Sequence, residues 1–141
     1  MASTSRCAGP GLYGPAAGSR EPFRSDGEAQ IGRCLDRYGI PYRHEHPLAV
    51  LDDGKLRVWY PDFQLDHYGM LIEYGGRLDD PHYRNGWEHK QRAYEANGID
   101  ALMLTPRDLT GDWPSRLLER IEGTLEDRVR RFASCIGEGG G

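Results

Sequence analysis

The sequence predicts an α/β domain in which helices flank a mixed sheet. Segments with helical spacing alternate with short segments rich in β-branched and aromatic residues. The chain of 141 residues is also long enough to bury one hydrophobic core. The expected order is helix, three strands, helix, strand, helix. These elements correspond to residues 25–39, 42–50, 56–65, 70–74, 86–97, 101–104 and 113–136.

Turn and cap signals bound the elements in the first half of the chain. The first helix begins at Ser25, because Ser25 and Glu28 have the spacing of a capping box, and it ends at Gly39. Residues 52–54, Asp-Asp-Gly, predict a tight turn between the first two strands. Residues 66–69 form a short loop before the third strand, which is typical of antiparallel neighbours.

The second half of the chain carries weaker boundary signals. Residues 75–85 are expected to form an irregular connection before the helix at 86–97. The last helix, 113–136, is expected to break at Gly123, because residues 124–127 have the spacing of a second capping box.

The ends of the chain are expected to be flexible tails, residues 1–20 and 137–141, which leaves 21–136 as the folded domain. Thirteen of the first twenty residues are Gly, Pro, Ala or Ser, a composition that buries little apolar surface. The mean hydropathy is −0.71, and the sequence contains neither a membrane-spanning apolar stretch nor a secretory signal. An intracellular location, cytoplasmic or nucleoid-associated, is therefore expected, with no membrane partner.

The net charge of −4 argues against a protein that coats nucleic acid nonspecifically. Arginines nevertheless cluster locally and are candidate phosphate contacts; the other interpretation is that they lie on solvated helix faces. They are Arg84, Arg92, Arg116, Arg120, Arg128, Arg130 and Arg131.

Cysteine and histidine patterns do not indicate a zinc site or a disulfide framework. The three cysteines, Cys7, Cys34 and Cys135, are far apart, and free thiols are expected. The histidines lack the spacing of a helical metal-binding pair and are expected at the surface. They are His44, His46, His67, His82 and His89.

Two carboxylates are expected to face each other on neighbouring strands. If residues 66–69 form the hairpin loop, Leu65 pairs with Met70, and Asp62 then lies opposite Glu73. Opposed like charges destabilise a sheet unless a cation or a shared proton lies between them. A divalent metal ion, Mg²⁺ or Mn²⁺, bound between the two carboxylates would compensate for their repulsion. The other interpretation is that one or both acids face solvent at strand ends.

Lys90 is expected to lie against this pair of acids. It shares a helical stripe with Trp87 and Tyr94, whose aromatic rings should face the sheet. A lysine that extends to solvent from the edge of the stripe is the alternative. Glu28 is open to two interpretations, because it shares a stripe with the apolar residues of the first helix and also fits the third position of a capping box.

These residues, in this order of elements, resemble the PD-(D/E)xK nuclease superfamily, whose restriction-endonuclease-like core is αβββαβα. Pro61 and Asp62 stand where the family has its Pro-Asp pair, and Glu73 stands at its second acid. Glu28 stands where many members carry an acid on the first helix. The lysine that usually follows the second acid by two residues is absent, since Gly75 occupies that position.

A branch of this superfamily carries the lysine on the following helix, and the chain resembles that branch. The resemblance is carried by residues 73–83, 87–94 and 97–99, and the segment 42–48 is similar to the first strand of the branch. It covers about residues 25–122. Members of the branch occur as stand-alone proteins and attached to helicases.

The resemblance implies a deoxyribonuclease that depends on Mg²⁺ or Mn²⁺ and hydrolyses phosphodiester bonds. Tyr94 would contact the phosphate or position Lys90, and Arg77 would contact the substrate backbone. The implied residues are Asp62, Glu73, Lys90 and Glu28 for catalysis, Asp62, Glu73 and the Tyr74 carbonyl for the metal, and Tyr94 and Arg77 for substrate binding.

The implied substrate is DNA, with RNA left open, and the implied activity is that of an endonuclease with structure-selective or partner-directed targeting. Because the net charge is negative, a homodimer or a helicase- or recombination-type partner is expected to assist binding. The main alternative is a catalytically inactive nuclease-fold module that binds nucleic acid or assembles with a DNA-processing complex. A domain of a transposition or defence complex, active only with its partners, is a further alternative.

Overall fold

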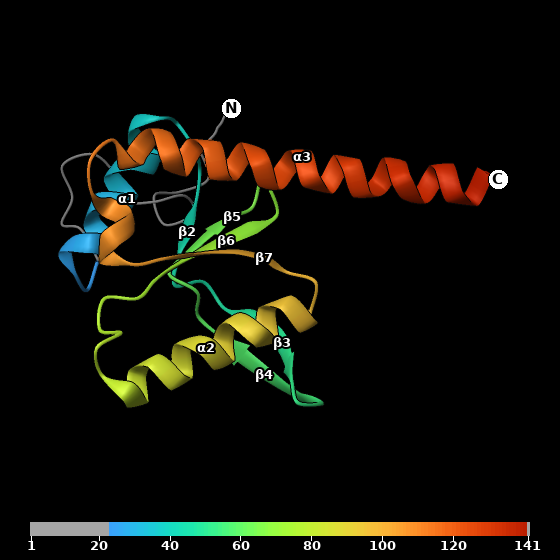
Figure 1. The fold of residues 1–141 in the computed structure, drawn as a ribbon. Coiled ribbons are helices and arrows are strands. Elements are labelled where there is room, and N and C mark those ends of the chain that lie inside the picture. The colour runs from blue at the N-terminus through green and yellow to red at the C-terminus, as the bar shows by residue number, and fades with distance from the viewer. Residues whose placement is uncertain (1–22, 141) are drawn as a thin grey trace. The chain divides into compact units, whose positions relative to one another are not determined.

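The computed structural model describes residues 23–140, so the predicted tail at 1–20 lies outside the described residues. The chain divides into two compact units, Met1–Asp108 and Leu109–Gly141, where the sequence predicts one folded domain. In chain order (Figure 1), the elements are α1 (Asp26–Arg37), β2 (Arg43–His44), β3 (Leu48–Asp52), β4 (Lys55–Trp59), β5 (Phe63–Leu65), β6 (Met70–Tyr74), α2 (Pro81–Ala96), β7 (Asp100–Leu104), the 3-10 helix η1 (Pro106–Leu109) and α3 (Trp113–Gly140).

The first unit is built on a mixed sheet, which confirms the predicted α/β class. The strand order is β2-β5-β6-β7, with antiparallel pairing up to β6 and parallel pairing of β6 with β7. The parallel pair is joined through α2, as a crossover requires. Helices α1 and α2 lie on opposite faces of this sheet (Figure 1).

Strands β2 to β5 form one long two-stranded ribbon with an interruption in the middle. The β2/β5 and β3/β4 pairings share one continuous register, which ends with Asp52 opposite Lys55. The two-residue turn beyond this pair consists of Asp53 and Gly54, whose φ angles of 55° and 79° are those that a twisted hairpin turn needs.

Two prolines explain the interruption. Pro47 and Pro61 have no N–H group to donate, so the regular ladder stops on both arms of the ribbon. The predicted continuous strands 42–50 and 56–65 are therefore each divided in two.

The two faces of the sheet are packed differently. On the α2 face, Val50, Leu71 and Tyr94 form a buried cluster. On the α1 face, the ring of Tyr74 lies against the backbone at Gly27, where a β-carbon would be only 2.2 Å from the ring. Glycine at this position therefore lets α1 approach the sheet closely.

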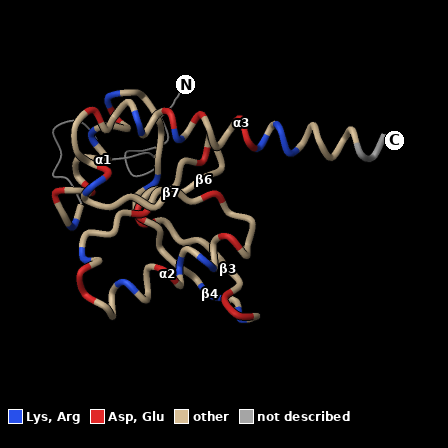
Figure 2. The backbone as a smooth tube through the Cα atoms, in the orientation of Figure 1, with Lys and Arg blue, Asp and Glu red and all other residues tan. Residues whose placement is uncertain are grey.

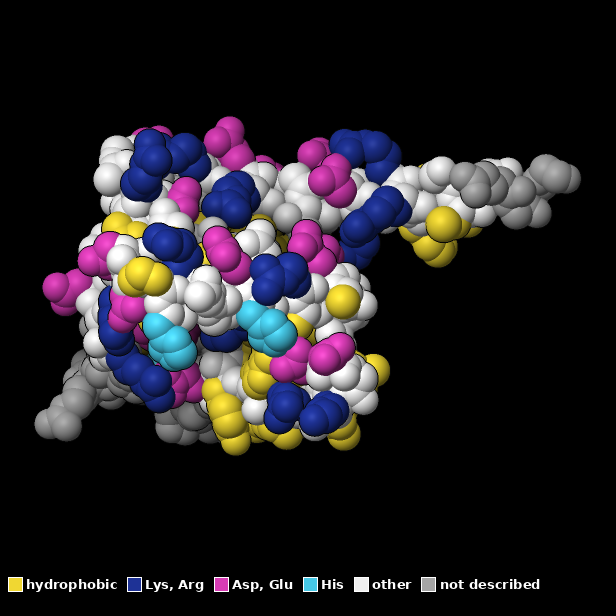
Figure 3. All heavy atoms as spheres, turned by 60° about the horizontal axis from the view of Figure 1, so that its bottom comes forward, with side chains coloured by type: hydrophobic (Ala, Val, Ile, Leu, Met, Phe, Trp, Pro, Cys, Tyr) yellow, Lys and Arg dark blue, Asp and Glu magenta, His cyan; other side chains and the backbone are white. Residues whose placement is uncertain are grey.

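The outer face of the β3–β4 ribbon is not part of this core. Leu51, Leu56 and Val58 are each more than half exposed, the lowest being Val58 at 55%. Figure 3 shows apolar side chains beside Lys and Arg along the lower edge of the face that carries α2.

Helix α2 begins at Pro81, five residues before the predicted start at Gly86. Asp80 caps it, because its Oδ1 accepts hydrogen bonds from the backbone N–H groups of His82 (3.0 Å) and Tyr83 (3.4 Å). Proline is well suited to the first helical position. The prediction that residues 75–85 are irregular throughout is therefore wrong for the last five of them.

Helix α3, which makes up most of the second unit, continues through Gly123 and as far as Gly140. The predicted break is wrong: Thr124 is an interior residue whose Oγ1 donates to the Arg120 carbonyl at 2.8 Å. A glycine inside a helix costs only about 1 kcal/mol, which strong helix formers on both sides offset. Helical backbone also covers most of the predicted tail at 137–141.

No helix within residues 23–140 combines the length and the apolar character that a bilayer crossing requires. Cys34 is buried and Cys135 is exposed, and both are free thiols as expected. Cys7 lies outside the described residues.

We expect Gly27→Ala to lower the free energy of unfolding by about 1–3 kcal/mol, because the added methyl group collides with the Tyr74 ring. Chemical denaturation measures this change. Gly86→Ala is the matched control: its β-carbon meets nothing within 4 Å on α2, so it should stabilise the protein by about 0.5–1 kcal/mol. Equal effects of the two substitutions would contradict the close approach of α1.

Candidate metal-binding and catalytic site

A pocket in the first unit gathers charged side chains from α1, the β2–β5 ribbon, β6 and α2. Five carboxylates and three cationic side chains line it, together with several aromatic rings. The charged residues are Asp26, Glu28, Glu45, Asp62, Glu73, Arg24, Arg77 and Lys90.

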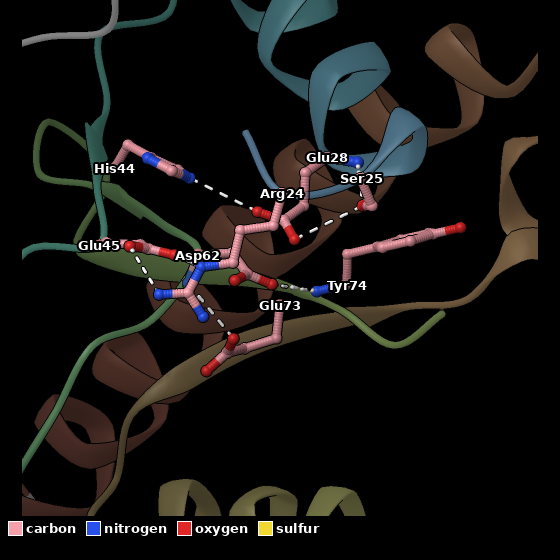
Figure 4. Close-up of polar contacts among 8 residues, drawn as sticks. All are labelled: Arg24, Ser25, Glu28, His44, Glu45, Asp62, Glu73 and Tyr74. Carbon is pink, nitrogen blue, oxygen red and sulfur yellow. Dashed lines mark hydrogen bonds and ion pairs between the residues drawn. The ribbon is translucent and has the colours of Figure 1, made fainter. Parts of the chain in front are cut away.

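Asp62 and Glu73 face each other in the register that the sequence predicts. Leu65 pairs with Met70 and Phe63 with Ile72, which places Asp62, the residue just before β5, opposite Glu73. The Asp62 N–H donates to Glu73 Oε1 at 3.3 Å, and the Tyr74 N–H donates to Asp62 Oδ2 at 2.8 Å (Figure 4). Glu73 is only 2% exposed.

This arrangement changes the acidity of Asp62. Burial and the negative charge of Glu73 together raise its pKa to about 7, and the hydrogen bond from Tyr74 opposes both effects. Near neutral pH, Asp62 therefore carries a proton part of the time. The carboxylate pair has too little positive charge around it for both acids to ionise freely.

Lys90 on α2 lies beside the pair, as the helical stripe predicts. Its Nζ is 3.3 Å from Glu73 Oε2, and its side chain is 37% exposed, so the ammonium reaches both the buried acid and the pocket. Trp87, one turn earlier, covers Gly75, where a β-carbon would be 2.8 Å from the indole ring. Trp87 therefore leaves no room for a side chain at position 75, and it lies on α2, the same helix that carries Lys90.

Tyr94 binds Glu73 from the buried side, where α2 packs on the sheet. Its hydroxyl donates to Glu73 Oε2 at 2.5 Å, and the residue is only 1% exposed. Burial and the charge of Glu73 raise the pKa of Tyr94, so the hydroxyl remains a donor at all ordinary pH values. Tyr94 therefore fixes the position of Glu73 and does not line the pocket, whereas the resemblance implies contact with the phosphate or positioning of Lys90.

Glu28 satisfies both interpretations of its sequence position. Its backbone N–H donates to the Ser25 Oγ at 3.2 Å, which is half of a capping box. Its side chain is nevertheless buried and lines the pocket. Its Oε1 lies 3.4 Å from His44 Nε2.

The sequence analysis does not predict three residues in or beside the pocket: Arg24 and Glu45, which line it, and His44, which contacts Glu28. His44 was expected at the surface, yet its side chain is only 10% exposed. The Glu45 N–H donates to the Asp62 carbonyl at 3.3 Å, and Arg24 Nε lies 3.0 Å from Glu45 Oε2 (Figure 4). The sequence contains a signal for Glu45, namely the tight turn at 53–54. This turn fixes the register of the ribbon, and the register places Glu45 opposite Asp62.

Arg77 lines the pocket but is bound to its own neighbours. Its Nη2 is 3.5 Å from Asp80 Oδ2, and its guanidinium lies 5.3 Å from the centre of the Tyr83 ring. Arg84 and Arg92 are exposed on α2, and the other candidate phosphate contacts are on α3 in the second unit. Acidic residues are interspersed with basic ones along the described backbone (Figure 2).

No protein-family model, no curated protein and no solved structure matches this chain. The functional interpretation therefore depends on the chemistry of the site itself.

We expect Asp62→Asn to stabilise the protein above neutral pH. The pKa of Asp62 is raised in the folded state, so the folded protein binds more protons than the unfolded chain between about pH 4 and 7, and the free energy of unfolding falls as the pH rises through that range. The asparagine variant does not ionise and therefore keeps this free energy of unfolding. The difference from wild type amounts to at most about 4 kcal/mol at pH 8.

Denaturant titrations of both proteins at acidic and alkaline pH measure the difference, which should be small near pH 4 and largest near pH 8. Asp79→Asn, at an exposed position on the loop before α2, is the control and should show no such dependence. A difference between Asp62→Asn and wild type that does not change with pH would contradict the burial of this acid.

We expect Tyr94→Phe to lower the free energy of unfolding by about 1–3 kcal/mol, because it removes a donor from a buried carboxylate while preserving the shape of the ring. Tyr60→Phe, at a position 59% exposed on the pocket rim, should change it by less than about 0.5 kcal/mol. Thermal and chemical denaturation measure both. Similar values for the two variants would show that Glu73 does not need this hydroxyl.

Proposed function

We propose that the protein is a Mg²⁺- or Mn²⁺-dependent nuclease that hydrolyses phosphodiester bonds of DNA, as an endonuclease whose targeting is structure-selective or partner-directed. The observation that carries the proposal is the convergence of two opposed carboxylates, the half-buried Asp62 and the buried Glu73, with the ammonium of Lys90 on the edge of an open pocket. Two acids and a lysine in this relation suit phosphoryl chemistry.

We also propose that the chain belongs to the branch of the PD-(D/E)xK superfamily that carries its lysine on the helix. The order of α1, antiparallel strands, α2 and a parallel strand β7 supports this assignment, as it corresponds to the restriction-endonuclease-like core. The placement of Lys90 beside Glu73, in the absence of a side chain at Gly75, supports the branch.

The donor set fits a hard divalent cation. Asp62 and Glu73 offer carboxylate oxygens, and the backbone of Tyr74, whose N–H already binds Asp62, offers a carbonyl next to them. Oxygen ligands of this kind suit Mg²⁺ and Mn²⁺. Burial and repulsion from Glu73 raise the pKa of Asp62, and a dication between the two acids would compensate for both effects. Bound there, the metal would supply charge to the scissile phosphate and lower the pKa of a coordinated water.

The protein's own groups orient the substrate. Lys90 can donate from its half-exposed ammonium to a phosphate oxygen or to the attacking water while it remains paired with Glu73. Tyr94 holds Glu73 in place from the buried side. Arg24 and Arg77, which reach the pocket rim, are placed to contact the flanking phosphates.

The surface charge supports selection by shape or by a partner. The net charge is −4, and acidic residues are interspersed with the basic ones, so long-range attraction to duplex DNA is weak (Figure 2). A branched, nicked or single-stranded substrate, or a second protein or copy that adds cationic surface, supplies the missing binding energy.

The test is a panel of labelled linear, nicked, branched and single-stranded DNA, with a single-stranded RNA, each incubated with Mg²⁺, with Mn²⁺ and with chelator. We expect metal-dependent cleavage of at least one DNA, and a rate loss of at least about 100-fold in Asp62→Asn, Glu73→Gln and Lys90→Met.

Lys55→Met and Glu88→Gln, at exposed positions on β4 and α2, are matched controls and should cut at the wild-type rate. Cleavage that persists in chelator or in the site variants would contradict the proposal. If no substrate is cut with either metal, the inactive nucleic-acid-binding module becomes the better description.

A further inference from the structure

We propose that Glu28, His44 and Glu45 form a second cation site, on the α1 side of the pocket and separate from Asp62 and Glu73. Each of the three side chains offers one ligand atom, and these atoms all lie within 4.8 Å of one another. The ligand is a first-row transition-metal dication such as Mn²⁺, Co²⁺ or Zn²⁺, because the set combines one imidazole nitrogen with two carboxylates. The site does not depend on the nuclease proposal.

The spacing of Glu28 and His44 suits two ligands of one ion better than a hydrogen bond. His44 Nε2 lies 3.4 Å from Glu28 Oε1. Charge-assisted hydrogen bonds are shorter, about 2.7–2.9 Å. Two ligand atoms that are each about 2.1 Å from one ion, at tetrahedral or octahedral angles, lie roughly 3.0–3.5 Å apart. The two side chains therefore already have the separation that a shared ion requires.

Both of these side chains are held in place by their surroundings. Glu28 is fixed on the first turn of α1 by the cap at Ser25. The His44 ring packs edge-on against Phe23, with ring centres 4.7 Å apart, and against Phe63, at 5.8 Å. The side chains of Glu28 and His44 are each only 10% exposed. Because Glu28 and His44 are already held in place, binding an ion costs little side-chain conformational entropy.

The third ligand, Glu45, is paired with a cation that can be displaced. Arg24 binds its carboxylate through two contacts, of 3.0 and 3.3 Å, yet the Arg24 side chain is 77% exposed (Figure 4). An exposed ion pair of this kind contributes little free energy. A dication bound between Glu28 and His44 would supply the charge that Arg24 supplies, and it would release the arginine toward the pocket.

The donor set distinguishes this site from the one at Asp62. Imidazole is a good ligand for Co²⁺ and Zn²⁺, a weaker one for Mn²⁺ and a poor one for Mg²⁺, whereas the Asp62–Glu73 site offers oxygen atoms. The pocket is thus expected to hold two cations of different preference, with Mg²⁺ restricted to the all-oxygen site.

The experiment is a titration with Mn²⁺ in the Asp62→Asn, Glu73→Gln double variant, followed by the electron paramagnetic resonance signal of the free ion. We expect one Mn²⁺ per chain, with affinity for Mg²⁺ weaker by at least about 10-fold. Adding His44→Gln should weaken Mn²⁺ binding at least about 10-fold, whereas His82→Gln, at an exposed position on α2, should leave it unchanged. Arg24→Gln should tighten binding several-fold by releasing Glu45.

Absence of Mn²⁺ binding in the folded double variant would overturn the proposal, as would binding that does not respond to His44→Gln. No change on Arg24→Gln would remove Glu45 from the ligand set. If circular dichroism shows that the double variant does not fold, the wild-type chain is titrated instead, and His44→Gln must then reduce the stoichiometry by one ion per chain. Because binding is the readout, a chain without nuclease activity can still pass this test.

Discussion

The structure of the first unit depends on the opposition of two carboxylates, Asp62 and Glu73, at the end of the β5/β6 pair. Like charges removed from water are costly, and here they are compensated by three donors from two elements, α2 and β6. Glu73 receives the ammonium of Lys90 and the hydroxyl of Tyr94, while Asp62 receives the N–H of Tyr74. The site therefore exists only when α2 is packed on the sheet, so folding and site assembly are the same event.

Backbone geometry makes this packing feasible. The prolines at 47 and 61 stop the ribbon ladder just before Asp62, so its carboxylate lies at the margin of the sheet next to the pocket. At Gly75 the chain has no side chain, and Trp87 fills the space. A lysine at that position would displace the indole ring, which is a physical reason for the ammonium to come from α2 instead.

Sequence reasoning predicts the parts of the site that follow from local periodicity. A four-residue loop and the two-residue period of strands set Asp62 opposite Glu73, and the helical period sets Lys90 and Tyr94 on one stripe. Sequence reasoning fails where one local pattern is compatible with two structures, or where a position depends on the pairing of two separate hairpins. The sequence predicts an irregular connection at residues 75–85, although Asp80 in this segment caps α2. The position of Glu45 follows only when the registers of both hairpins are considered together.

The central claim is that the charge deficit between Asp62 and Glu73 is filled by a dication. Its most direct test is the anomalous scattering of crystals of the wild-type protein grown with Mn²⁺. A peak within bonding distance of one oxygen from each of these two carboxylates, lost in crystals of Asp62→Asn, is the predicted result. Ordered carboxylates with no peak between them, or side chains turned toward separate surfaces, would contradict the account.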